Sequence, residues 1–387
     1  VKYFPLHTNA NEVGMHDITP PVTYPVDGAP ASHTYSVVIQ SIGRASLASA
    51  AAVAKGLGIS AADVVQCLYR APAILVDHIE ERVAAHLAGL LASMGFHADA
   101  LPSAAAPAKT SELFDVALYL QDASRLSEAA ERYAQFTGLP QADAIKMLLQ
   151  PPGLALGSVS AATVQALADA MGDSVELVST SQTQGLFDVF LADCPAVVKK
   201  RLLDDLTAAG VPLVNDSGLI ASGINRRALD PIWQRHKTNS ALRIVHQDFL
   251  RFDLTLLPLA QALTLEQKNA LVDWVDIPLE LTDEVAQAAP VAIRESIAYG
   301  DLNPILEGFA QVDLAVRADL ITFQLLGLTI MSCPDLAALN RLLASFNCNT
   351  VVTRLPTTLN EQFPEIHARV LHASLQQAGV QVEFTKH

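Results

Sequence analysis

The fold is decided by a short stretch that returns along the chain, FDVALYL at residues 114–120. Similar stretches begin at four other places: YSVVIQS from Tyr35, FDVFLAD from Phe187, FDLTLLP from Phe252 and FQLLGLTI from Phe323. In each stretch apolar residues either alternate with polar ones or form a continuous run, and they include aromatic and β-branched residues. This composition is typical of a half-buried strand. Their starts lie 79, 73, 65 and 71 residues apart, so one small unit is predicted to repeat.

The intervals between these stretches also end alike. A run with helical period closes near Gly95, Gly172 or Gly379, where a left-handed cap is expected, and a short strand follows. Two further helices are expected after each opening strand. In the first interval Ser60 and Asp63 make a capping-box-like start for the second helix. The middle strand is expected to be short everywhere, because little in the sequence marks it.

These elements predict an α+β fold class. The chain is expected to form about five tandem small β-α-α-β-α-β domains, each a three-stranded sheet with helices on one face. The expected parts are an N-terminal extended tail (1–34), a first domain (35–101), an Ala/Pro linker (102–113), a second domain (114–180), a diverged third domain (187–251), a fourth domain (252–322) and a diverged fifth domain (323–387).

The first domain resembles the C-terminal domain of the bacterial ribosomal stalk protein of the large subunit. GLGI at residues 56–59 stands where that family has a Gly-Leu-Gly-Leu turn, and APA at residues 71–73 matches its Ala-Pro step. The resemblance implies the domain fold. In that family lysines on the first two helices recruit translational GTPases. Here Ser60 and Asp63 occupy lysine positions and only Lys55 remains nearby, so GTPase recruitment is not expected.

Composition and charge narrow the class of protein. Among 387 residues, 51% are hydrophobic and 17% charged, which is enough to bury cores. The net charge of −15 repels nucleic acid and anionic lipid, so nucleic acid is an unlikely partner. The longest apolar stretch, 320–333, is too short to span a bilayer. The four cysteines lack metal-type spacing and are expected to be reduced thiols in a cytoplasmic protein.

Charge is distributed unevenly between the expected domains. The fourth has 3 basic and 12 acidic residues, whereas the third has 9 basic and 7 acidic. The basic cluster of the third domain is interpreted as a docking patch for an acidic protein surface or, as a less favoured target, nucleic acid. The alternative is a solvated face, or a patch held by the acidic fourth domain of the same chain. The residues expected to contact partners are Lys55, Gly56, Leu57, Gly58 and Ile59 in the first domain, and Arg226, Arg227, Arg235, His236, Lys237 and Arg243 in the third.

No enzyme motif is present in the sequence. GxGxxG, P-loop, HExxH and GxSxG patterns are absent, so neither a cofactor nor a metal nor a small-molecule substrate is expected. Cys194 and Cys333 each precede a proline at an expected helix start, where a thiol can become reactive. The alternative is that each cysteine is unreactive and simply provides a small apolar side chain that suits a tight turn.

The sequence therefore predicts a non-enzymatic adaptor or scaffold subunit that presents tandem domains to protein partners in a larger cytoplasmic assembly. One alternative is a translation-associated factor that binds the ribosome or translational GTPases. A second alternative is an enzyme with a site between the repeats.

Overall fold

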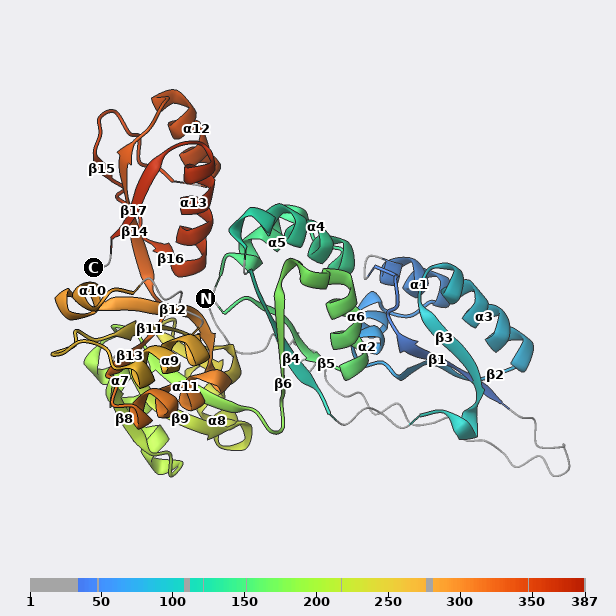
Figure 1. The fold of residues 1–387 in the computed structure, drawn as a ribbon. Helices are drawn as coiled ribbons and strands as arrows, with labels where there is room; N and C mark the ends of the chain where they lie inside the picture. The colour runs from blue at the N-terminus through green and yellow to red at the C-terminus, as the bar shows by residue number, and fades with distance from the viewer. Residues whose placement is uncertain are drawn as a thin grey trace, which may run out of the picture.

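The computed structural model describes residues 34–46, 49–107, 112–120, 122–150, 152–216, 218–275, 281–346 and 348–385. These residues form five small antiparallel sheets accompanied by helices, which confirms the α+β class (Figure 1). The expected N-terminal tail lies outside the described residues except for its last residue. Residues 108–111 of the expected linker lie outside them as well.

In every sheet the strand that comes first along the chain lies in the interior, with later strands on both sides. We call each sheet with its helices a unit, numbered 1 to 5 in chain order. The five interior strands are β1 (Tyr35–Ser41), β4 (Phe114–Tyr119), β7 (Leu186–Leu191), β11 (Arg251–Leu256) and β14 (Leu325–Ser332). They fall on the recurring stretches of the sequence. Their central apolar side chains are fully buried, as at Val37, Val116, Val189, Leu254 and Leu328.

Units 1, 2 and 4 have the element order β-α-α-β-α-β. Unit 1 continues with α1 (Ala50–Leu57), α2 (Ala61–Tyr69), β2 (Ala73–Ile79), α3 (Glu81–Ser93) and β3 (His97–Pro102). Unit 2 continues with α4 (Leu126–Thr137), α5 (Gln141–Leu148), β5 (Leu154–Val159), α6 (Ala161–Met171) and β6 (Glu176–Ser181). Unit 4 continues with α9 (Leu265–Val275), α10 (Asp283–Ala288), β12 (Val291–Ala298), α11 (Tyr299–Gln311) and β13 (Val316–Leu320).

Units 3 and 5 depart from this order, and their sheets have four strands instead of the expected three. Unit 3 contains α7 (Ala196–Ala208), β8 (Leu213–Asp216), β9 (Leu219–Asn225), α8 (Arg226–His236) and β10 (Leu242–His246). Its β8–β9 hairpin stands where a second helix was expected, because two apolar runs flank a turn segment that ends at Gly218. Unit 5 contains α12 (Leu336–Ser345), β15 (Thr357–Thr358), β16 (Phe363–Pro364), α13 (Glu365–Gln377) and β17 (Gln381–Thr385).

The expectation of a short middle strand is wrong in units 1 to 4. The strands β2, β5, β9 and β12 have between 6 and 8 residues. Each contains one residue with a positive φ near its end, and each shows register shifts against the interior strand. A bulge of this kind interrupts the apolar alternation that marks a strand in a sequence.

Neighbouring units are packed against one another. Units 1 and 2 share one continuous hydrophobic core. The Ser160 N–H donates to the Tyr69 carbonyl at 2.7 Å, which joins the start of α6 to the end of α2. A second cluster includes Ala117, Phe190 and Phe249 and brings together units 2 and 3 and the segment that leads into unit 4. In Figure 1, units 1 and 2 lie side by side and unit 5 lies above unit 4.

Candidate functional site

A buried aspartate recurs at the start of the interior strands. Asp115, Asp188 and Asp253 each follow a phenylalanine, and at most 9% of their surface is exposed. Each accepts the backbone N–H of the positive-φ residue in the neighbouring strand. These bonds join Ser158 to Asp115 at 3.0 Å, Gly223 to Asp188 at 3.1 Å and Ser296 to Asp253 at 3.0 Å. The carboxylate thus satisfies an N–H that the bulge removes from the ladder.

We call this arrangement of a buried carboxylate and a bulge the corner. Unit 1 has an equivalent corner in which the carboxylate lies on the bulged strand and a hydroxyl lies on the interior strand. Ser36 occupies the interior strand, and Asp77 lies on β2 beside His78, whose φ is 56°. The hydroxyls of Ser36 and Ser103 both donate to the Asp77 carboxylate. These two hydrogen bonds lower the pKa of Asp77 below its ordinary value. In all four units the positive-φ residue lies three residues before a helix begins.

The residue that follows the last strand completes this corner. Gln182 donates from its Nε2 to Asp115 at 2.6 Å, and Gln247 donates to Asp188 at 2.8 Å. Ser103 has the same place after β3. In units 1 to 3 the corner therefore joins three segments at one end of the sheet. Because a buried carboxylate is tolerated only when donors surround it, the geometry of this end is tightly specified.

The corner of unit 2 also contacts unit 3. His246 Nε2 lies 3.0 Å from the Asp115 Oδ2, and the exposed fractions of the two side chains are 3% and 0%. The imidazole packs at 3.9 Å from the Phe187 ring, between ring centroids. Gly185 lies so close that a Cβ there would come within 2.7 Å of the imidazole. Nε2–H donates to the ionised carboxylate, and Nδ1 has no hydrogen-bond partner among the described residues.

Arg251 joins units 2 and 4 at the beginning of β11. Only 3% of its side chain is exposed, its Nη2 donates to Glu176 at 2.7 Å, and its guanidinium lies 4.0 Å from the centre of the Tyr119 ring. The Tyr119 hydroxyl donates to the Phe249 carbonyl at 2.7 Å. Burial raises the pKa of Tyr119 and the Arg251 charge opposes this rise. Two charges and a phenol are thus held together at this junction, with Arg251 buried and Glu176 partly exposed.

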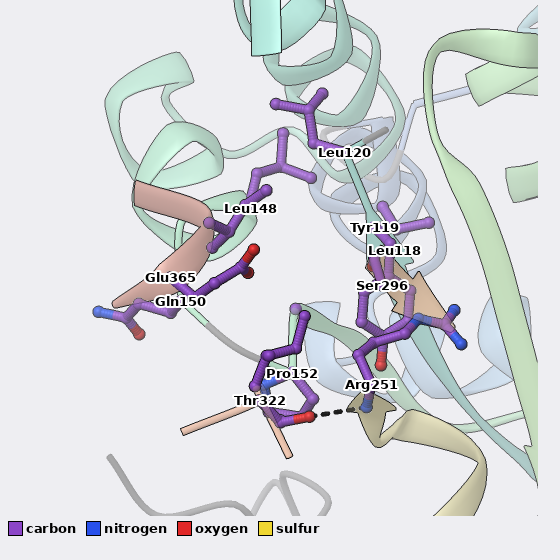
Figure 2. A pocket seen from close by; sticks show the side chains of 13 residues that line it. Leu118, Tyr119, Leu120, Leu148, Gln150, Pro152, Arg251, Ser296, Thr322 and Glu365 are labelled. Atoms are coloured by element: carbon purple, nitrogen blue, oxygen red, sulfur yellow. Dashed lines mark hydrogen bonds between the residues drawn. The ribbon is translucent and has the colours of Figure 1, made fainter. Parts of the chain in front are cut away.

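A small cavity lies beside Arg251, where units 2 and 4 meet the beginning of α13 in unit 5. Figure 2 shows the lining side chains of Tyr119, Ser296, Thr322 and Glu365 around it. Its volume is about 40 Å³. One water molecule needs roughly 10–15 Å³ of such space, so the cavity suits a few waters, well below the roughly 300 Å³ of common ligand pockets.

Arg369 on α13 connects unit 5 to unit 4. Its guanidinium donates to Glu365 on the same helix and to Glu295 on β12. Its Nη2 also lies 3.5 Å from Asp253, the corner carboxylate of unit 4. Burial raises the pKa of Glu365, although Arg369 acts in the opposite direction. Two of the corner carboxylates, Asp115 and Asp253, therefore have two roles. Each stabilises the bulge inside its own unit, and each contacts another unit through His246 or Arg369.

The partner-binding residues expected in unit 1 lie together at one exposed turn. Lys55, Gly56, Gly58 and Ile59 are exposed and Leu57 is half-buried. Gly58 ends α1 with a left-handed φ of 69°, and Ser60 then caps α2 by accepting the Asp63 N–H. The turn is fixed by these caps and presents Ile59, which is 38% exposed.

The basic residues expected to bind partners in unit 3 are divided among several surroundings. Arg235 Nη1 and His236 Nε2 contact the Asp205 carboxylate at 2.9 and 2.7 Å, and His236 is only 5% exposed. The hydrogen bond from His236 is the main reason that the pKa of Asp205 is lowered. The remaining members are Arg226, which pairs with Asp230 at 3.7 Å, Arg243, which lies over Phe323, and the exposed residues Arg227 and Lys237.

The thiols are all free among the described residues. Cys194 and Cys333 are half-buried. Burial raises the pKa of Cys67 to about 11 and that of Cys348 to about 11. Within the described ranges, no group of three or more His, Cys, Asp or Glu side chains is arranged to hold a metal ion.

Comparison with known proteins gives no relative for this chain. No family model, curated protein or solved structure matches it. The resemblance of unit 1 to the stalk domain stays a prediction from its residues. None of the helices in the described part of the chain has the length and apolar character needed to cross a membrane.

The sequence analysis missed the corner carboxylates, although a signal was present. The Phe-Asp pair stands at the same place in three of the recurring stretches. Strand alternation alone places a charge next to an apolar residue on the opposite face of the sheet, so the signal is only the recurrence of aspartate at one strand position. The partners of each aspartate lie 35 or 43 residues further along the chain, where the sequence marks no strand end.

Proposed function

We propose that this chain is a non-enzymatic scaffold subunit of a cytoplasmic assembly, and that it holds protein partners on the outer surfaces of units kept at fixed positions. The observation that carries the proposal is the buried contact between Asp115 and His246 across units 2 and 3. A buried hydrogen-bonded pair between two units favours one relative orientation, because a shift would leave a polar group without its partner.

Similar contacts support the same function at other junctions. Arg251 contacts Glu176 between units 4 and 2, and Arg369 contacts Glu295 between units 5 and 4. Two sites on one rigid body bind two linked epitopes with a high effective concentration, provided that the spacing fits. A semi-rigid arrangement of units therefore suits a protein whose task is to position others.

Unit 1 offers the surface on which we expect a partner to bind. Ile59 lies at the exposed turn after α1, α3 carries two further exposed apolar side chains, Val83 and Leu90, and the exposed Met94 follows as its C-cap. Val83 and Leu90 are about half exposed, at 51% and 49%. Their spacing of seven residues places them on one side of the helix. Exposed apolar groups gathered in this way are typical of protein-binding surfaces.

Affinity purification of the full chain from its native cells tests the proposal. The unmodified chain is expected to retain one or more proteins in stable proportion, and the Leu90→Asp and Ile59→Asp variants are expected to lose at least one of them. A matched variant at another exposed site, Val197→Asp on α7, is expected to retain them all; Val197 is 80% exposed. Recovery of the chain alone, without any retained protein, would contradict the scaffold function.

A further inference from the structure

Unit 4 has an open groove on its surface between two helices. α9 and α11 lie side by side (Figure 1). The groove between them has a volume of about 500 Å³. Gln267 on α9 donates to the Val312 carbonyl at 3.0 Å, which joins the two helices at one end of the groove. Its lining includes Leu265, Glu266, Asp273, Trp274, Gly308 and Gln311.

Two large apolar side chains are exposed in this groove. Trp274 is 39% exposed, and Leu265, near the other end of α9, is 76% exposed. The indole lies directly on α11 because residue 308 is glycine: a Cβ there would come within 2.5 Å of the ring. Tryptophan is among the residues that most often dominate the free energy of protein association. The groove therefore has an aromatic anchor point whose position is fixed by Gly308.

The charge around the groove is negative. Glu266 and Asp273 line it, and the residues 252–322 include 12 acidic and 3 basic side chains. Each of the three basic side chains is engaged inside the unit. Lys268 pairs with Asp283 at 3.3 Å, Arg294 donates to the Trp274 carbonyl at 3.0 Å, and Arg317 pairs with Asp319 at 2.8 Å. The field at the groove therefore attracts cations and repels phosphates.

We propose that this groove docks a basic amphipathic helix of a protein partner. The apolar face of that helix would contact Leu265 and Trp274, and its lysines or arginines would face Glu266 and Asp273. A cation above the indole would gain a further attraction. α9 has 11 residues, about 16 Å of helix, which matches roughly three turns of a bound helix. The inference rests on the scaffold function and names one class of partner for it.

Trp274 provides a direct reporter of docking. The chain contains two tryptophans, so the Trp233→Phe background leaves Trp274 as the only one. The probe is a helical peptide of about 14 residues built from leucine on one face and lysine on the other, added to the full chain at about 0.15 M ionic strength. The Trp274 emission is expected to shift to shorter wavelength and to saturate. A peptide with glutamate in place of lysine is expected to produce no shift.

Charge reversal then locates the bound peptide. Asp273→Lys or Glu266→Lys is expected to weaken binding by about tenfold. Glu284→Lys makes the same change of charge on an exposed residue of unit 4 outside the groove, and is expected to weaken binding less than threefold. Gly308→Ala forces the indole away and is expected to change the emission before any peptide is added. Equal weakening by Asp273→Lys and Glu284→Lys, or equal binding of the glutamate peptide, would overturn the proposal.

The peptide-binding test of the groove and the purification test of the scaffold function can fail independently of each other. If the native partners are retained but the Leu/Lys peptide leaves the Trp274 emission unchanged, the groove proposal is wrong and the scaffold function stands. If the peptide binds as expected but the chain retains no protein in cells, the groove is a peptide site and the scaffold function is wrong.

Discussion

His246, the last residue of β10, donates from Nε2 to Asp115 in β4 across 131 residues of sequence, and both side chains are almost completely buried. Asp115 also accepts from the Ser158 N–H and from Gln182. One carboxylate therefore fixes a bulge in its own sheet and the position of the following unit. The folded units and their arrangement depend on the same small set of polar groups.

Removal of this carboxylate is expected to destabilise the protein strongly. In Asp115→Ala, the Ser158 N–H, the Gln182 amide and the His246 imidazole lose their acceptor in a buried region. The expected loss of unfolding free energy is about 3–5 kcal/mol. Chemical denaturation of the full chain measures it. Asp143→Ala, at an exposed carboxylate paired with Lys146, is expected to change the free energy by at most about 0.5 kcal/mol. Similar losses of unfolding free energy in the two variants would contradict the stabilising role of Asp115.

Positions 223 and 296 are equivalent in the bulges of units 3 and 4. Replacing glycine at the first and introducing glycine at the second are expected to have opposite effects on stability. Gly223 has a φ of 68° and open space around the position of a Cβ, so Gly223→Ala introduces no clash but a strained backbone. The expected destabilisation is about 1 kcal/mol. Ser296 has a φ of 56° at the same place in unit 4, and Ser296→Gly is expected to be neutral or stabilising, because it removes that strain. Thermal unfolding followed by circular dichroism measures both. Destabilisation by Ser296→Gly as large as that by Gly223→Ala would contradict the shared geometry.

The stability of unit 5 is expected to depend on pH through Glu361. Burial alone would raise the pKa of this carboxyl, but hydrogen bonds from Thr350, Cys348 and the Asn349 N–H lower it from 4.5 to about 2. Because the pKa of the folded state lies below the ordinary value, the stabilisation is present above about pH 4.5. It is lost as the pH falls toward 2.

Hydrogen exchange in residues 348–363 between pH 6 and pH 2.5 measures this effect after correction for intrinsic exchange rates. Protection is expected to fall with pH in the unmodified chain. In Glu361→Gln, protection is expected to be low throughout and to lose most of its pH dependence. The exposed residue Glu383 supplies the control, since Glu383→Gln should behave as the unmodified chain does. A pH dependence that survives in Glu361→Gln would assign the effect to another group.

The junction between units 4 and 5 is expected to loosen when Arg369 is removed. Arg369→Ala leaves Glu365, Glu295 and Asp253 close together without their shared cation. Since Arg369 and Glu295 are partly exposed, the expected destabilisation is about 1–2 kcal/mol, less than for a fully buried pair. Small-angle scattering is expected to show a larger radius of gyration, while Arg341→Ala, at an exposed arginine on α12, leaves it unchanged. Identical scattering of the two variants would indicate that Arg369 does not hold the junction.

Local patterns in the sequence predicted the elements well where one segment determines its own structure. The interior strands follow from apolar alternation, and the cap at Ser60 follows from short-range chemistry. The β8–β9 hairpin was missed because the repeat pattern of the other units predicts a second helix at this place. The middle strands were underestimated because a bulge at Ser158 or Ser296 breaks the alternation.

The polar contacts could not be predicted in the same way. The partner of Asp115 is decided by how two sheets meet, and apolar periodicity carries no information on that. The exposure of Trp274 depends likewise on the distance between α9 and α11, which Gly308 sets. From the sequence alone, Asp115 cannot be distinguished from an ordinary strand residue, nor Trp274 from an ordinary helix residue.

Cross-linking of the complex purified from native cells tests the scaffold most directly. Lys55 in unit 1, Lys146 in unit 2 and Lys237 in unit 3 are exposed, and an amine-reactive reagent attaches to each. The scaffold account predicts links from Lys55 to a partner protein, together with one unchanged set of links between units 2 and 3 in the free chain and in the complex. Links confined to the chain itself, or links between units 2 and 3 that change from one preparation to the next, would contradict it.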